Sequence, residues 1–182
     1  MGKGAFGSVK LVMNEDDNQR YAMKIMKKDF LKKKNISKHE SAFMSVLKEI
    51  EIMKAMHHPN IIKLHEVMND PAHNKLRLVM DYHSKGSLMS IVKDSKRGLP
   101  VEKVHNIFRG IAGAIFYCHT IAGIVHRDIK PDNVVLSQKD EPILIDFGVS
   151  AVFDNDDDDT LNNVIGSVQF FAPELVSPVK KK

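Results

Sequence analysis

Three polar side chains suited to phosphoryl transfer occupy the short stretch from Asp128 to Asn133, directly after His126-Arg127. The carboxylate of Asp128 can accept a proton from an attacking hydroxyl group. The amine of Lys130 can neutralise charge on a transferring phosphoryl group, and the side-chain oxygen of Asn133 can bind a hard metal ion. This spacing indicates a loop built to transfer a phosphoryl group to a hydroxyl.

A second carboxylate follows in Asp146-Phe147-Gly148, after an apolar run at 143–145. The run predicts a short buried strand that carries Asp146 to the same place as Asn133. Oxygen ligands from these two residues suit Mg²⁺. Each motif alone is a weak signal, because such triplets are usually ordinary turns or strand ends, but the two in this order are specific.

The first residues of the chain contain Gly2, Gly4 and Gly7, followed by Val9. Glycines at this spacing let backbone amides approach phosphate oxygens without a side chain between them. A dinucleotide-binding turn would need a strand before it and a helix after it, whereas residues 9–13 alternate like a strand. We therefore expect a phosphate-binding loop between two antiparallel strands.

The rest of the chain supplies the elements that must position these groups. Alternating patterns and helical spacing predict strands at 20–26, 61–68, 75–80 and 134–136, and helices within 38–56 and at 101–119. The second helix is expected to bury one apolar face, formed by Val104, Ile107, Phe108, Ile111, Ile115 and Cys118. The lysine-rich residues before the first helix predict a solvent-exposed connection.

Together these motifs resemble the eukaryotic protein-kinase family, in which Asp128–Asn133 matches the catalytic loop and Asp146–Gly148 the metal-binding motif. Ala172–Glu174 matches the end of the activation segment. The resemblance implies an α+β, bilobal fold with a small antiparallel-sheet N-lobe and a mainly helical C-lobe, truncated at both ends. The implied N-lobe, hinge and partial C-lobe are residues 1–80, 81–87 and 88–182.

The resemblance implies ATP- and Mg²⁺-dependent transfer to Ser or Thr of protein substrates, because Lys130 and Ser167 match the Ser/Thr-kinase pattern. The implied catalytic residues are Asp128, Lys130 and Asn133, with Asn133 and Asp146 as metal ligands and His126 in a packing role. The implied ATP-binding positions are Gly2, Gly4, Gly7, Val9, Ala22, Lys24, Glu49, Met80, Asp81, His83 and Val135.

Lys24 lies in an otherwise apolar run, and a lysine on a buried side needs a counter-charge. By resemblance, it contacts the ATP phosphates and pairs with a glutamate of the next long helix. Glu49 is the better match for that partner. Glu51 is the alternative if the register of the helix differs, because it falls on another face.

The segment between the metal-binding motif and Ala172 has Asn163 where many kinases carry an activating threonine. We hypothesise activity without phosphorylation at this site, with Thr160 as the remaining candidate phosphosite. The acidic run 154–159 has three readings: a solvated loop, a weak cation site or a permanent negative partner for Arg127. Closely packed like charges favour the solvated loop.

A closer resemblance, to the calcium/calmodulin-dependent protein kinase kinases, is carried by residues 21–24, 48–53, 58–64, 66–71 and 146–150. It implies an upstream kinase that phosphorylates other kinases. The neighbouring branch that activates the AMP-activated kinase fits the lysine-rich connection about as well. The insert before the first long helix is short and no calmodulin-binding tail is present, which puts calmodulin control in doubt.

Composition constrains the fold less than the motifs do. A chain of 182 residues, 43% hydrophobic and 27% charged, is long enough to form one or two small hydrophobic cores. The net charge of +4 comes mostly from lysine clusters without interleaved aromatic residues, which predict solvated faces and no nucleic-acid partner. Cys118 is the single cysteine, so an internal disulfide is excluded. No apolar run is long enough to span a membrane and no signal-peptide pattern begins the chain, so we expect a cytoplasmic protein without a membrane partner.

A function from a second class is a catalytically incompetent fragment, or a kinase-like interaction module that binds nucleotide without catalysis. Intact Lys24, Asp128, Asn133 and Asp146 favour the enzyme. The absent lower helices favour the second reading for the isolated chain, because apolar surface would be left uncovered. Alone, the chain is therefore expected to be poorly stable and weakly active.

Overall fold

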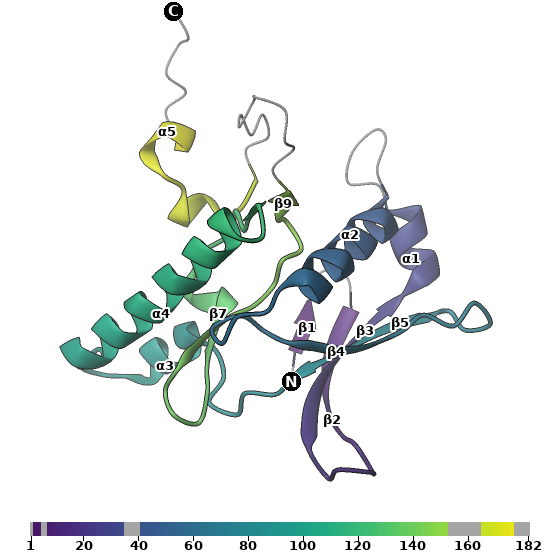
Figure 1. The fold of residues 1–182 in the computed structure, drawn as a ribbon, viewed down its shortest axis with the longest axis horizontal. Helices are drawn as coiled ribbons and strands as arrows, with labels where there is room; N and C mark the ends of the chain where they lie inside the picture. Colours follow the sequence, from purple (N-terminus) through teal and green to yellow (C-terminus); the bar gives the residue numbers. More distant parts are fainter. Residues whose placement is uncertain (1, 5–6, 35–40, 153–164, 177–182) are drawn as a thin grey trace, which may run out of the picture. The chain divides into compact units, whose positions relative to one another are not determined.

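The computed structural model of the chain describes residues 2–4, 7–34, 41–152 and 165–176. They form two compact units (Figure 1). The N-terminal unit comprises residues 1–57 and 61–84, and the C-terminal unit comprises 58–60 and 85–182. The acidic run 154–159, Thr160 and Asn163 lie outside the described residues, so their predicted roles stay predictions.

A five-stranded antiparallel sheet forms the body of the N-terminal unit. Its strands, in spatial order, are β1 (Gly2–Gly4), β2 (Gly7–Met13), β3 (Arg20–Lys27), β5 (Lys75–Asp81) and β4 (Leu64–Met68). β1 occupies the stretch predicted as a glycine-rich loop, and Gly4 lies opposite Gly7 in the β1–β2 pair. The predicted phosphate-loop glycines are therefore part of a β1–β2 hairpin.

Two helices pack on this sheet, α1 (Lys28–Lys33) and α2 (Ala42–Ala55). Ser41 begins α2, because its hydroxyl accepts the amide hydrogen of Met44 at 3.4 Å. The core between helices and sheet consists of seven buried apolar residues: Met26, Leu31, Ala42, Val46, Ile50, Leu76 and Leu78.

Within the segment 28–33 before α2, the prediction of an exposed connection is wrong for Lys28 and Leu31, whereas the other four residues are exposed as expected. This segment is helical, with Leu31 fully buried and Lys28 only 8% exposed. The run was misread because Leu31 is its only aliphatic anchor, and a lysine can bury its methylene stem when its amine finds an acceptor.

The C-terminal unit is built around the 20-residue helix α4 (Val101–Thr120), preceded by α3 (Leu88–Asp94). Two short two-stranded antiparallel sheets follow, β7 (Val134–Leu136) with β8 (Pro142–Leu144), and β6 (Ile124–Val125) with β9 (Ala151–Val152). The remaining elements are two 3₁₀ turns, Pro131–Asn133 and Val168–Phe170, and the short helix α5 (Pro173–Val176).

Close approach of α4 to β8 requires a glycine. A Cβ at Gly110 would lie 2.5 Å from Cγ of Pro142, so any side chain there would push the helix and strand apart. The carbonyl oxygen of Pro142 accepts a hydrogen bond from Nδ2 of Asn60 at 2.7 Å. These contacts hold α4 and Asn60 against β8.

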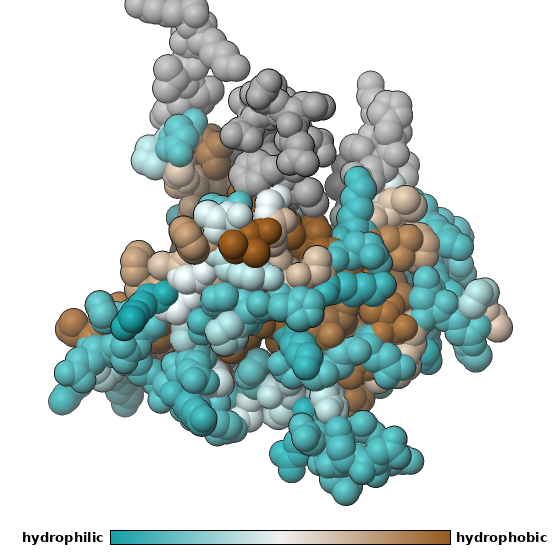
Figure 2. Space-filling view, viewed as in Figure 1, coloured by the Kyte–Doolittle hydropathy of each residue, from teal (hydrophilic) through white to brown (hydrophobic). Residues whose placement is uncertain are grey.

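The buried face of α4 differs from the predicted one. Ile107, Ile111, Ala114 and Cys118 are buried, whereas Phe108 is 74% exposed. Adjacent helical residues point about 100° apart, so Ile107 and Phe108 cannot share one narrow face. Val104 is also exposed, and Figure 2 shows apolar surface where Figure 1 places this helix. Within the described part of the chain, no helix combines the length and apolarity needed to cross a membrane.

Candidate active site

In the N-terminal unit, Lys24 on β3 forms an ion pair with Glu49 on α2. Lys24 Nζ donates to Glu49 Oε1 at 2.8 Å, and the Glu49 side chain is only 5% exposed. Glu49 is buried because it shares the sheet-facing side of α2 with Val46 and Ile50. Glu51, the alternative partner, is exposed and pairs with Lys54 at 2.9 Å.

The apolar side chains among the predicted ATP-binding residues of this unit share one face of the sheet with Lys24. Val9 lies opposite Lys24, and Ala22 lies opposite Met80. Directly opposed residues, and residues two apart on a strand, point to the same face. The apolar side chains of Val9, Ala22 and Met80 therefore lie on the same face of the sheet as that of Lys24.

The side chain of Asp81 points to the other face of the sheet. Asp81 pairs with Tyr21, which is next to Ala22 on β3 and therefore has its side chain on the other face. Its carboxylate contacts Nε2 of His65 at 2.6 Å, and the rings of His65 and Tyr21 meet edge to face. The side chain of Asp81 is thus engaged away from the Lys24 face. Its backbone is the part that can serve a ligand on that face.

Glycines and a histidine complete the predicted positions in the N-terminal unit. Gly2 lies opposite Val9, and a Cβ at Gly7 would overlap the carbonyl of Ile25. His83 follows β5, and its Nε2 is buried without a hydrogen-bond partner among the described residues. Burial lowers the pKa of His83 despite the nearby carboxylate of Asp81, so the ring is neutral at pH 7.

In the C-terminal unit, the carboxylate of Asp128 is the centre of a hydrogen-bond network. Lys130 Nζ donates to Asp128 Oδ2 at 2.6 Å and to Ser167 Oγ at 2.6 Å. The Ser167 amide donates to Asp128 Oδ1 at 2.9 Å. Asn133 Nδ2 donates to the Asp128 backbone oxygen at 2.9 Å and to its Oδ2 at 3.0 Å. The structure thus brings together Asp128, Lys130 and Asn133.

This network keeps Asp128 ionised. Burial acts to raise the pKa of Asp128, but hydrogen bonds from Lys130 and Ser167 and the charge of Lys130 outweigh it and hold the pKa below its usual value. The carboxylate is consequently able to accept a proton at neutral pH. Its side chain is 13% exposed, so a substrate hydroxyl can still reach it.

Two residues beside the network adopt left-handed backbone conformations, Arg127 with φ of 65° and Asp146 with φ of 64°. Such conformations are strained for residues with a Cβ and persist where surrounding contacts fix them. Arg127 is fixed by Nε, which donates to the carbonyl oxygen of Val149 at 2.5 Å. This contact therefore holds a strained backbone conformation directly before Asp128.

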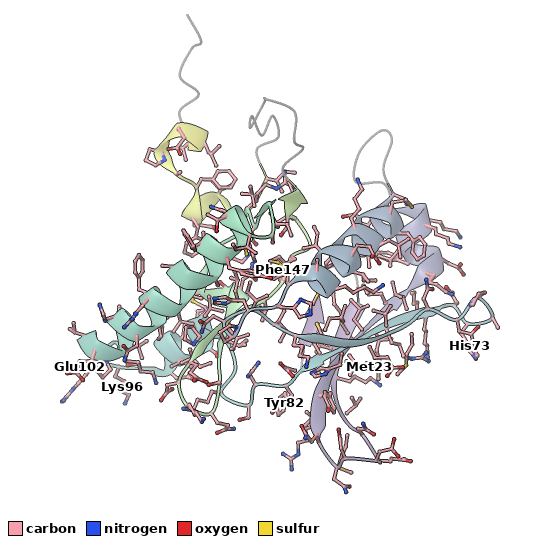
Figure 3. All side chains as sticks on the ribbon, in the orientation of Figure 1. Met23, His73, Tyr82, Lys96, Glu102 and Phe147 are labelled. Carbon is pink, nitrogen blue, oxygen red and sulfur yellow. The ribbon has the colours of Figure 1, made fainter. Side chains whose placement is uncertain are left out.

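His126 joins the catalytic-loop segment to the strand before Asp146. Its Nδ1 accepts the amide hydrogen of Asp128 at 3.3 Å, so Nε2 carries the proton directed at the Ile145 carbonyl oxygen at 3.1 Å. Burial lowers the pKa of His126, and its ring packs edge to face on Phe147, which is 1% exposed (Figure 3). A neutral, packed histidine fits these contacts.

Asn133 and Asp146 offer oxygen atoms suited to Mg²⁺. The donors of Asn133 are turned to Asp128, which directs its side-chain oxygen elsewhere, and its backbone oxygen accepts the Ile145 amide at 2.9 Å, next to the exposed Asp146. Among the described residues, no group of three His, Cys, Asp or Glu is arranged to hold a metal. Two protein oxygens with phosphate oxygens form a usual Mg²⁺ ligand set.

Val135, the remaining predicted ATP-binding residue, lies on β7 opposite Ile143. Sequence reasoning missed the part played by Gly166, whose φ is 129°. A Cβ there would lie 2.5 Å from the Arg127 carbonyl oxygen, so the glycine lets Ser167 reach Asp128. The dipeptide Gly166-Ser167 was the available signal, but only the tertiary contact shows why glycine is needed.

Comparison with known proteins gives a consistent assignment. A family model described as the protein kinase domain matches residues 1–182. A probable serine/threonine-protein kinase of Dictyostelium discoideum is 41% identical over 176 residues, covering 96% of this chain and 24% of the relative. CBL-interacting protein kinase 15 of Oryza sativa subsp. japonica is 36% identical over 181 residues, 98% of this chain and 39% of the relative.

A calcium/calmodulin-dependent protein kinase kinase of Caenorhabditis elegans is 37% identical over 193 residues, covering 97% of this chain and 35% of the relative. The chain thus spans between 24% and 39% of the length of these three relatives. The predicted fold class and the predicted resemblance are confirmed. Because the family model extends over the entire sequence and the Asp128 network lies within it, this chain belongs to the protein kinase domain family.

Proposed function

We propose that this chain is a protein serine/threonine kinase domain that transfers the γ-phosphoryl group of ATP to Ser or Thr of protein substrates. The observation that carries the proposal is the network in which Lys130 joins Asp128 to Ser167. It holds an ionised, partly exposed carboxylate beside a cation, as proton acceptance next to a transferring phosphoryl group requires.

Each member of the network has a defined task. Asp128 accepts the hydrogen bond of the substrate hydroxyl and orients its oxygen for attack. Lys130 holds Asp128 in place and offsets negative charge on the phosphoryl oxygens. Asn133 and Asp146 would hold Mg²⁺, which supplies charge neutralisation of the phosphates when bound.

ATP recognition is proposed for the remaining predicted positions. Lys24, oriented by Glu49, would bind phosphate oxygens, as would the backbone amides of the glycine hairpin. Apolar contacts to adenine are proposed for Val9, Ala22, Met80 and Val135. Hydrogen bonds to the adenine edge are proposed for the backbones of Asp81 and His83.

The substrate class is proposed from resemblance. The Caenorhabditis elegans relative is named a calcium/calmodulin-dependent protein kinase kinase. We propose that this chain likewise acts on another protein kinase. A pseudokinase role is the weaker alternative, because Lys24, Asp128, Asn133 and Asp146 are all intact. Lys24 also has its expected partner, Glu49, and Asp128 is paired with Lys130.

The decisive experiment compares Asp128→Asn with Asp132→Asn, an exposed carboxylate in the same loop. In Mg²⁺-ATP assays on a Ser/Thr peptide, we expect Asp128→Asn to lower kcat by about 10²- to 10⁴-fold, because the proton acceptor is lost. Asp132→Asn should retain turnover. Equal turnover in both variants would refute the assigned role of Asp128.

A binding experiment tests the metal ligands separately. Mg²⁺-ATP should raise the thermal unfolding midpoint of the wild type, because a ligand that binds the folded state stabilises it. Asp146→Asn should abolish the Mg²⁺-dependent part of this shift, with Asp132→Asn again as control. A full shift in Asp146→Asn would exclude Asp146 as a ligand.

A further inference from the structure

The turn between β4 and β5 is fastened to the start of α1 by four hydrogen bonds within the N-terminal unit. Lys28 Nζ donates to the Asp70 carbonyl oxygen at 2.6 Å, and the Lys28 amide donates to the Asn74 carbonyl oxygen at 3.3 Å. Asn74 Oδ1 accepts the Asp29 amide hydrogen at 2.9 Å, and Asn74 Nδ2 donates to Asp29 Oδ2 at 2.7 Å. We name these contacts the α1 latch.

Burial distinguishes Lys28 from the neighbouring lysines. It is 8% exposed, whereas the other lysines of this segment, at 27 and 32–34, are exposed. Burying a charged amine is unfavourable unless a polar group compensates it, so the Asp70 carbonyl is a structural requirement of this conformation. The lysine belongs to the interior of the latch and is not a solvated surface charge.

Side-chain hydrogen bonds also form within the turn itself. The carboxylate of Asp70 accepts the Ala72 amide at 2.8 Å and contacts Nδ1 of His73 at 2.5 Å. The pKa of Asp70 is lowered most by the hydrogen bond from the Ala72 amide and next by the one with the His73 side chain. The carboxylate therefore stays ionised in this arrangement. Figure 3 labels His73 at the tip of the turn.

From the latch, contacts continue to the Lys24–Glu49 pair. Leu31 of α1 is fully buried in the same core as Val46 and Ile50, which flank Glu49 on α2. At the other end of α1, the Lys34 carbonyl oxygen accepts the Ala42 amide hydrogen at 2.7 Å, at the first residue of α2. Helix α1 is therefore tied to the turn at its start and to α2 at its end.

We propose that the α1 latch positions α2 for phosphoryl transfer, with Asp29 and Asn74 as positioning residues that act through Glu49. The inference rests on the proposed kinase function. The Lys24–Glu49 bond is a single 2.8 Å contact from helix to strand, and a shift of α2 by about 1 Å would break its geometry. The latch restricts such a shift from a distance.

The test replaces one exposed side chain by a near-isostere. Asn74→Asp puts a second carboxylate against that of Asp29, which removes the donor and adds repulsion. Combining it with Asp29→Asn supplies a donor on the other side, so both side-chain hydrogen bonds can form again. Asn69→Asp adds the same charge to the same exposed turn outside the latch and is the matched control.

We expect Asn74→Asp to lower kcat/KM for ATP about tenfold, because Lys24 is misplaced when Glu49 shifts. The Asp29→Asn/Asn74→Asp pair should restore it, and Asn69→Asp should leave it unchanged. In a Glu49→Gln background, Asn74→Asp should cause no further loss, because the residue through which the latch acts is already disabled. A purely structural role would lower kcat/KM equally in both backgrounds.

A second measurement is independent of turnover. Amide hydrogen exchange along α2 should be faster in Asn74→Asp than in Asn69→Asp and should return to the wild-type rate in the paired variant. Unchanged exchange in α2, or an equal kinetic loss with and without Glu49, would overturn the proposal. Wild-type protein without Mg²⁺-ATP turnover would instead refute the kinase function, while exchange would still decide whether the latch holds α2.

Discussion

Glu49 in the N-terminal unit and Asp128 in the C-terminal unit are both carboxylates of the proposed active site, but they are held by different means. Glu49 is 5% exposed and is fixed by a helix packed on a sheet. Asp128 is 13% exposed and lies in a loop, where Lys130, Asn133 and Ser167 donate hydrogen bonds to it. The first depends on a hydrophobic core and the second on a local polar network.

Because the two carboxylates are held differently, substitutions near them should affect stability and activity to different degrees. A residue fixed by core packing cannot be changed without a cost to folding, because burial of the charge depends on its partner. A loop residue fixed by hydrogen bonds can be displaced while most of the unit stays folded. Substitutions in the two units should therefore give different ratios of lost activity to lost stability.

The largest combined effect is expected for Lys24→Met, because it leaves the buried carboxylate of Glu49 without its cation. We expect a loss of about 3 kcal/mol in the free energy of unfolding, and turnover lower by about 100-fold or more. Denaturant unfolding and peptide phosphorylation measure the two quantities. Adding Glu49→Gln should recover part of the stability but none of the activity.

The matched control is Lys54→Met, which breaks the exposed pair with Glu51. Exposed helical pairs contribute about 0.3–0.5 kcal/mol, so this variant should be close to wild type in both assays. If Lys24→Met and Lys54→Met unfold alike, burial does not determine the cost in this unit.

An intermediate effect is expected in the C-terminal unit from Gly166→Ala. Its φ of 129° and the nearby Arg127 carbonyl leave no room for a Cβ, so Ser167 must move away from Asp128. We expect turnover to fall about 10- to 100-fold, since catalytic groups tolerate little misplacement. Steady-state kinetics and thermal unfolding measured on the same preparation would show whether activity falls more than stability.

Gly123→Ala provides the comparison, because φ at Gly123 is 62° but nothing lies within 4 Å of its Cβ position. It should cost about 1–2 kcal/mol of stability through backbone strain alone, with turnover retained. Equal kinetic losses in Gly166→Ala and Gly123→Ala would show that strain, and not the contact with Ser167, is responsible.

The smallest effect is a pH dependence from His126. Burial lowers its pKa below the ordinary 6.5, so between these two values the unfolded chain binds a proton that the folded chain does not. The free energy of unfolding should therefore decrease as pH falls below about 6.5, by at most about 1.4 kcal/mol per pH unit from this residue.

Denaturant unfolding of His126→Gln between pH 5 and 7 measures this contribution, and its slope should be shallower than that of the wild type. Burial also lowers the pKa of His58 and His83, so part of the slope will remain. His105→Gln, at an exposed position of α4, is the control. A slope unchanged by His126→Gln would show that this histidine is not the acid-sensitive group.

The sequence allowed much of the site to be predicted where function depends on residues close together in the chain. Asp128, Lys130 and Asn133 lie within one loop, so their spacing already predicted that they act together, although their hydrogen bonds to one another came only from the structure. Alternation located β3 and β5 closely, because strand periodicity is a local property.

Features that depend on distant contacts could not be predicted in the same way. The latch joins residues more than 40 positions apart. A lysine-rich composition predicts a solvent-exposed segment unless it is known that the Asp70 carbonyl oxygen accepts a hydrogen bond from Lys28. On α4, apolar residues occur on more than one side, so periodicity alone could not choose between Ile107 and Phe108. Conformation at Gly166 depends on a carbonyl supplied by Arg127.

The burial of Cys118 has a practical consequence. It is the single cysteine of the chain, is 1% exposed, and burial raises its pKa to about 11. Thiol reagents act on the exposed thiolate, so they can react with this protein only when α4 opens. The rate at which Cys118 is labelled therefore reports how often the C-terminal unit opens, and no engineered probe is needed.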